Sequence, residues 1–82
     1  MRSDEILATS ADQLGQILKG VRKDLGLTQE QLGRKVGLHQ KEISKMENGM
    51  SRTSVDGLFR LLSALEFELV VRPRDSDLQG GW

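Results

Sequence analysis

The chain has 82 residues, with 12 basic and 12 acidic side chains, one histidine and no cysteine. This length predicts one domain. Disulfides and Cys-ligated zinc are excluded, and His39 alone cannot supply a histidine metal cluster, so we expect no metal and no cofactor. No apolar run is long enough to cross a membrane, which predicts a cytoplasmic protein without membrane contact. No nucleophile–base pair, paired carboxylates or phosphate-binding Gly loop is visible, so an enzyme is not expected.

The charges are unevenly distributed along the chain. Residues 19–60 carry nine Lys and Arg against five acids, an excess of four positive charges, whereas each of the two flanking segments has an excess of two negative charges. A basic centre between acidic ends fits a surface that binds an anion through its middle. An ordinary surface of mixed charge would also fit, so the excess of positive charge does not by itself indicate an anion-binding surface.

The N-terminal half predicts three helices. Residues 1–9 show no period and are interpreted as an arm that precedes a domain spanning residues 10–72. Ser10 and Thr28 each begin a capping-box pattern, with a glutamine three positions on. An apolar stripe follows Ser10 as far as Leu25, and Gly26 ends that helix. The helix after Thr28 is short and stops at Gly37, and a third begins near His39 or Gln40.

The C-terminal half predicts one more helix and a strand. Asn48 and Gly49 end the third helix, residues 49–53 form a loop, and a fourth helix opens at Thr53–Asp56 and runs to Leu65. In residues 66–72 the period changes to two, and the positions that predict a buried strand face are Phe67, Leu69 and Val71.

A lone strand leaves its backbone donors and acceptors unpaired. The same strand from a second copy would satisfy both, so we predict a homodimer. The alternative is that residues 66–72 continue the fourth helix. Residues 73–82 are polar and are predicted to be a flexible tail; Trp82 is either inert or an anchor for a partner protein.

Residues 29–46 carry the most informative pattern. Two short helices meet at a tight turn, and seven positions have the small or apolar residue that a helix-turn-helix requires: Leu32, Gly33, Val36, Gly37, Leu38, Ile43 and Met46. Gly33 would allow close approach of the second helix, and Gly37 would allow a positive φ at the corner. An ordinary helical hairpin is the alternative.

The third helix favours DNA binding. At 100° per residue, Ile43 and Met46 point inward, and the opposite face carries polar and basic side chains. These candidate base-reading residues are Gln40, Lys41 and Ser44, with His39 and Lys45 beside them. The candidate phosphate contacts are Gln29 at a helix start and Ser51, Arg52 and Thr53 in the following loop. Glu47 is expected to pair with a nearby arginine or with free backbone groups.

The run GLTQEQLGRKVGLHQKEISKMENG, residues 26–49, resembles the Cro/cI-like (XRE) helix-turn-helix family. The resemblance covers about residues 11–65 and implies a mainly all-α, lambda-repressor-like domain of four to five helices. The strand-like residues 66–72 and the short polar tail resemble the HipB-type antitoxins of type II toxin–antitoxin systems in particular. That resemblance implies a C-terminal strand paired across a homodimer, a palindromic operator DNA, and a HipA-type Ser/Thr kinase toxin as partner. It also implies the base-reading residues given above.

Three functions are therefore kept open. The first is a dimeric repressor that acts as an antitoxin, autoregulates its operon and binds a HipA-type kinase. The second is a stand-alone phage-type or metabolic repressor without a toxin partner. The third is a protein-interaction module in which the helix-turn-helix serves only as a scaffold; this last function predicts no binding to DNA at low salt.

Overall fold

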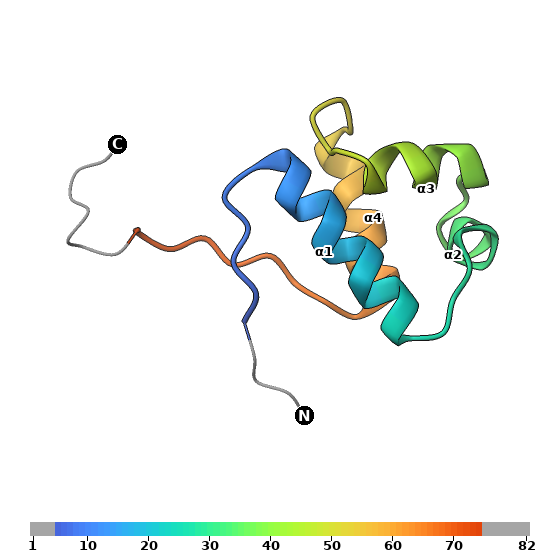
Figure 1. Ribbon diagram of the computed structural model, residues 1–82, viewed down its shortest axis with the longest axis horizontal. Coiled ribbons are helices and arrows are strands. Elements are labelled where there is room, and N and C mark those ends of the chain that lie inside the picture. Colours follow the sequence, from blue (N-terminus) through green and yellow to red (C-terminus); the bar gives the residue numbers. More distant parts are fainter. Residues whose placement is uncertain (1–4, 75–82) are drawn as a thin grey trace.

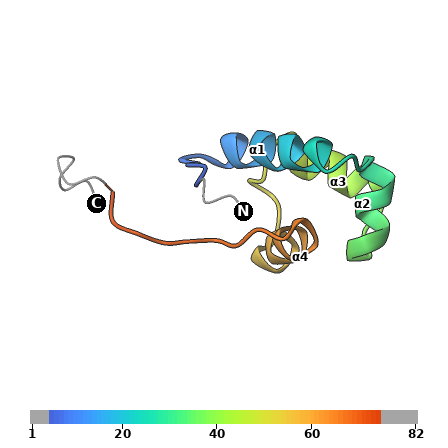
Figure 2. The same cartoon turned by 90° about the horizontal axis from the view of Figure 1, so that it is seen from below.

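The computed structural model describes residues 5–74. Four helices follow one another: α1 (Ala11–Asp24), α2 (Gln29–Val36), α3 (Gln40–Glu47) and α4 (Val55–Leu65). Figures 1 and 2 show α1 and α3 in one layer and α4 in another, with α2 at one end of the helical body. The predicted mainly helical fold class is confirmed, with four helices in the described part of the chain.

Local hydrogen bonds explain where the first two helices begin. The Ser10 hydroxyl accepts the backbone N–H of Gln13 at 3.1 Å. At α2 the capping box is complete, because Thr28 Oγ1 accepts the Gln31 N–H at 3.0 Å and Gln31 Oε1 accepts the Thr28 N–H at 2.8 Å. Each bond satisfies an N–H that the first turn of a helix leaves free. Both predicted starts are confirmed.

The start of α4 differs from the prediction by one residue. Ser54, not Thr53, is the N-cap, and its hydroxyl accepts the Gly57 N–H at 2.9 Å. Thr53 belongs to the preceding turn, since its N–H donates to the Met50 carbonyl at 2.9 Å. A Thr–Ser pair offers two candidate caps, and the sequence alone does not say which hydroxyl faces the helix.

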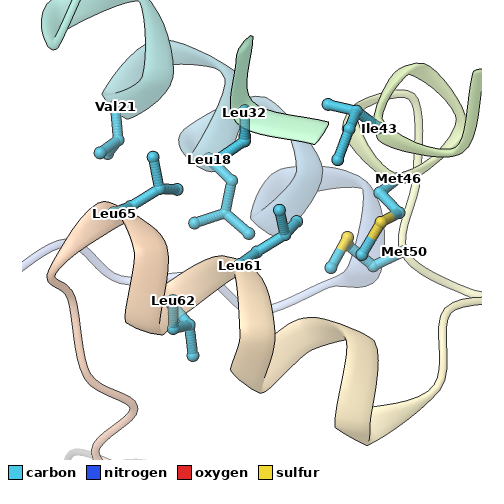
Figure 3. Close-up of a cluster of buried hydrophobic side chains, with 9 residues drawn as sticks. All are labelled: Leu18, Val21, Leu32, Ile43, Met46, Met50, Leu61, Leu62 and Leu65. Carbon is cyan, nitrogen blue, oxygen red and sulfur yellow. The ribbon is translucent and has the colours of Figure 1, made fainter. Parts of the chain in front are cut away.

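One apolar core holds the four helices together, as Figure 3 shows. The side chains meet between α1 and α3 on one side and α4 on the other. The buried members are Leu18, Val21, Leu32, Ile43, Met46, Met50, Leu61, Leu62 and Leu65. Every helix contributes, and Met50 adds a side chain from the loop. This common core fixes the angle at which α3 stands against the rest.

Helix α4 ends at Leu65, so the alternative that residues 66–72 continue this helix is wrong. Glu66 adopts the left-handed conformation (φ 63°), and the N–H of Phe67 donates to the Leu62 carbonyl at 2.8 Å. These are the bonds of a helix C-cap. Glu66 therefore turns the chain off the helix axis.

The predicted strand is also not formed. Residues 67–74 run without regular structure away from α2 and α3 (Figures 1 and 2). A strand needs a neighbour, and within residues 5–74 the arm supplies only a contact of 3.4 Å between Glu5 Oε1 and Arg72 Nη1. Phe67 packs back against its own core, whereas Leu69 and Val71 are 48% and 89% exposed. Pairing across a homodimer stays a prediction.

The remaining predictions about the ends fall largely outside the described residues, including Trp82 and most of the predicted tail at 73–82. Residues 5–9 of the predicted arm precede α1 without regular structure. None of the helices described is long and apolar enough to cross a membrane. Residues 5–74 likewise hold no group of three or more His, Cys, Asp or Glu that could bind a metal ion.

Candidate nucleic-acid interface

The turn between α2 and α3 depends on two glycines. A Cβ added to Gly33 would lie 2.5 Å from the Leu38 carbonyl oxygen, which is closer than any real side chain approaches. Gly37 has φ 75°, a conformation that favours glycine. The Leu38 N–H donates to the Gly33 carbonyl at 2.9 Å and closes the corner. The close approach predicted at Gly33 is therefore made with the turn backbone rather than with a side chain of α3.

The two faces of α3 have opposite character. Ile43 and Met46 are buried in the core, while Lys41 and Lys45 are exposed. Gln40 and His39 are exposed as well, and Ser44 is half-buried at the edge of this face. The five candidate base-reading residues thus lie together at the start and outer side of one helix. We call this surface, formed by His39, Gln40, Lys41, Ser44 and Lys45, the recognition face.

The first turn of α3 is held by a capping arrangement that the sequence analysis missed. His39 is the N-cap, and its ring atom Nδ1 accepts the Lys41 N–H at 3.0 Å. In return, Glu42 Oε1 accepts the His39 N–H at 3.0 Å. Histidine is not among the usual N-cap residues, so only the Glu three positions later could have signalled the cap.

A buried polar network joins α3 to α1 and α2. Arg22 Nε lies 2.6 Å from Glu47 Oε2, and the two side chains are only 7% and 3% exposed. Arg22 Nη1 also donates to the Leu27 carbonyl at 2.6 Å, and Gln29 Nε2 donates to Glu47 Oε1 at 3.1 Å. The predicted pairing of Glu47 with an arginine is confirmed. The amide of Gln29, predicted to contact a phosphate, is engaged at one of its two N–H groups.

The loop after α3 places the other predicted phosphate contacts beside the recognition face. Ser51 and Arg52 are exposed, and Thr53 is half-buried. A hollow of about 710 Å³ lies between this loop and α3, and the charged side chains that line it are Lys45 and Arg52 together with Asp12 and Glu42.

Gly15 is a second residue whose role in helix packing the sequence analysis did not predict. A Cβ at this position would lie 2.7 Å from the Met46 carbonyl oxygen and 2.8 Å from that of Glu47. Helix α1 therefore touches the backbone at the end of α3 directly. This contact, together with the Arg22–Glu47 pair, sets the distance between α1 and α3.

Comparison with known proteins identifies the family of this chain. The sequence pattern of the family described as helix-turn-helix matches residues 18–71. The chain is 37% identical over 62 residues to antitoxin HipB of Escherichia coli O6:H1 and 36% identical over 62 residues to antitoxin HipB of E. coli K12. The matches cover 76% of this chain and 66% and 70% of these relatives. The chain belongs to the helix-turn-helix family of the HipB antitoxins.

Solved structures agree with this family. A HipB variant in complex with the 20-mer O2 superimposes with a TM-score of 0.80 at 31% identity, covering 87% of this chain and 99% of that one. HipB in the HipA–HipB–O2–O3 complex gives a TM-score of 0.79 at 31% identity, covering 85% and 99%. The restriction–modification controller protein C.Esp1396I is more distant, with a TM-score of 0.66 at 26% identity, covering 71% and 75%.

Proposed function

We propose that this HipB-family chain is a sequence-specific DNA-binding repressor that acts in the cytoplasm as an antitoxin. The observation that carries the proposal is the recognition face, where Lys41 and Lys45 are exposed while Ile43 and Met46 anchor α3 from behind. Lys suits guanine O6 and N7, Gln suits adenine, and Ser suits either base. We infer that the start of α3 enters the major groove and reads the bases there.

Binding would require two copies of the chain. Leu69 and Val71 are exposed on an extended segment that has no neighbouring strand within residues 5–74. An antiparallel pair of these segments would bury both side chains and satisfy the backbone. A two-fold dimer then reads a palindromic operator, with its two recognition helices about 34 Å apart in successive major grooves.

The antitoxin role rests on the relatives. HipB has been solved in a complex named HipA–HipB–O2–O3, and the HipB chain in it is similar to this chain over nearly its whole length. We infer that this protein represses its own operon and binds a HipA-type Ser/Thr kinase. Trp82, which lies outside the described residues, is the candidate anchor for that partner because tryptophan contributes strongly at interfaces.

Two substitutions test the DNA proposal. Lys41→Ala removes a side chain of the recognition face and should weaken binding to the operator more than binding to random DNA. Arg52→Ala removes one loop cation from each protomer, so it should weaken both and lower the slope of log affinity against log salt by about 0.9 per protomer. Gel-shift titrations over a range of salt concentrations measure both effects. Equal losses on operator and random DNA for both variants would contradict the assignment.

Co-purification tests the toxin partner separately. The tagged chain, expressed with its neighbouring genes, should retain a kinase-like protein, and an adjacent kinase-like reading frame is expected. Tight operator binding with no retained kinase and no such reading frame would instead establish the stand-alone repressor. A folded chain that shifts no DNA at low salt would favour the protein-interaction module.

A further inference from the structure

His39 is the first side chain of the recognition face and also the N-cap of α3, the helix labelled in Figure 1. The inference drawn from this double position rests on the proposed function, because it concerns how the same face reads DNA. A long basic side chain at this position would adopt many conformations before it contacted DNA. An imidazole that caps the helix is held in place instead.

The cap decides which ring nitrogen carries the hydrogen. Nδ1 accepts the Lys41 N–H at 3.0 Å, so Nδ1 bears no hydrogen in this arrangement. The hydrogen of a neutral imidazole then lies on Nε2. The Glu42 carboxylate, which accepts the backbone N–H of His39 at 3.0 Å, holds the same turn from the other side.

The outer edge of the ring is therefore a single hydrogen-bond donor. Nε2 has no hydrogen-bond partner within residues 5–74, and the side chain is exposed. Since the cap already restricts both side-chain torsions, a contact from Nε2 loses little conformational entropy. Such a donor matches guanine O6 or N7, adenine N7, thymine O4 or a phosphate oxygen, and it does not match the amino groups of adenine or cytosine.

We propose that the Nε2–H of His39 donates one hydrogen bond to an acceptor atom in each operator half-site, while Nδ1 continues to cap α3. One residue thereby starts the recognition helix and reads the duplex. The acceptor belongs either to a base edge or to a phosphate. The two sources are separated by altering the duplex one atom at a time.

The test compares the wild-type chain with His39→Ser and His39→Ala. Serine keeps an oxygen that accepts the Lys41 N–H, whereas alanine removes the cap, so only His39→Ala should lower the unfolding midpoint. Both variants lack the Nε2 donor in both protomers and should bind the operator roughly 25- to 100-fold more weakly, the loss expected for two hydrogen bonds, one in each half-site. A chain carrying Nε2-methylhistidine at position 39, made by ligation, keeps Nδ1 as an acceptor and should show the same loss. If His39→Ser also lowers the unfolding midpoint, the Nε2-methylhistidine chain becomes the decisive variant for DNA binding.

The altered duplexes locate the acceptor. In an operator selected by the wild-type chain from random DNA, each purine N7 is replaced by carbon and each phosphate by neutral methylphosphonate, one at a time; thymine O4 and guanine O6 are tested by base analogues without these oxygens. One alteration should weaken the wild type 5- to 10-fold and leave His39→Ser unaffected. A base alteration assigns the bond to a base edge, and a methylphosphonate assigns it to a phosphate.

Two results would overturn the inference. One is wild-type affinity for the operator in both His39→Ser and the Nε2-methylhistidine chain. The other is a loss of affinity in which wild type and variants respond alike to every alteration of the duplex, because the side chain would then act only through the helix. A folded wild-type chain that selects no duplex at all would be a different failure, that of the proposed function.

Discussion

Gly15 and Gly20 lie on the same helix, yet the structure gives them opposite roles. A Cβ on Gly15 would meet the backbone oxygens of Met46 and Glu47 at 2.7 and 2.8 Å. A Cβ on Gly20 would meet nothing within 4 Å among the described residues. Sequence reasoning treats both simply as weak helix formers, whereas the packing of α1 against α3 requires only one of them.

Alanine substitutions should therefore change stability in opposite directions. Gly15→Ala forces α3 away from α1, and we expect the free energy of unfolding to fall by about 1–3 kcal/mol. Gly20→Ala should raise it by about 0.5–1 kcal/mol, because alanine restricts the unfolded chain and favours the helix. Urea denaturation of both variants measures this contrast. Equal effects would show that Gly15 is not a contact between the helices.

The buried Arg22–Glu47 ion pair is the second contact between individual residues that should affect stability. Glu47→Gln removes the negative charge beside a guanidinium whose side chain is only 7% exposed. We expect a loss of about 3–5 kcal/mol in the free energy of unfolding, since an uncompensated charge is left in the core. The control is Glu30→Gln, which breaks an exposed pair with Arg34 and should change stability by less than about 0.5 kcal/mol. Similar thermal midpoints for the two variants would contradict this prediction.

At the scale of the helix, the capping box of α2 should carry a measurable share of stability. Thr28→Ala removes the acceptor of the Gln31 N–H, and we expect the free energy of unfolding to fall by about 1 kcal/mol. Ser63→Ala, on the exposed side of α4, is the control and should change stability by no more than about 0.5 kcal/mol. A Thr28→Ala chain with an unchanged denaturation midpoint would mean that α2 is held by packing alone.

The elements show what a sequence can and cannot predict. The starts of α1 and α2 and the stop at Gly37 follow from bonds between residues three or four apart, and all three were predicted correctly. The two faces of α3 follow from helical periodicity in the same way. These features need no knowledge of the rest of the chain.

The missed cap of α3 is local, but histidine is an unusual N-cap residue. Other features depend on contacts between distant segments: the carbonyls that meet Gly15 come from more than thirty positions further along the chain, and the particular arginine that pairs with Glu47 lies 25 positions before it. The strand expected at residues 66–72 depends on a neighbour that one chain does not provide. The role of each candidate base-reading residue likewise depends on a duplex, so these roles remain proposals.

At the scale of the whole molecule, Leu69→Asp tests the dimer. A charge in the paired segments should convert dimer to monomer in light scattering, and binding to a palindromic operator should fall with it because one recognition helix alone is left. Val55→Asp, the same kind of change at another exposed apolar residue, should leave the chain dimeric. A Leu69→Asp chain that remains dimeric would place the interface elsewhere.

The left-handed turn at Glu66 has a consequence for how contacts are shared. By directing residues 67–74 away from α2 and α3, it carries this segment, with its exposed aliphatic residues, away from the helix that bears Lys41 and Lys45. In the proposed dimer, self-association and duplex binding would therefore use different atoms. The pair could assemble without covering the side that is proposed to meet the double helix.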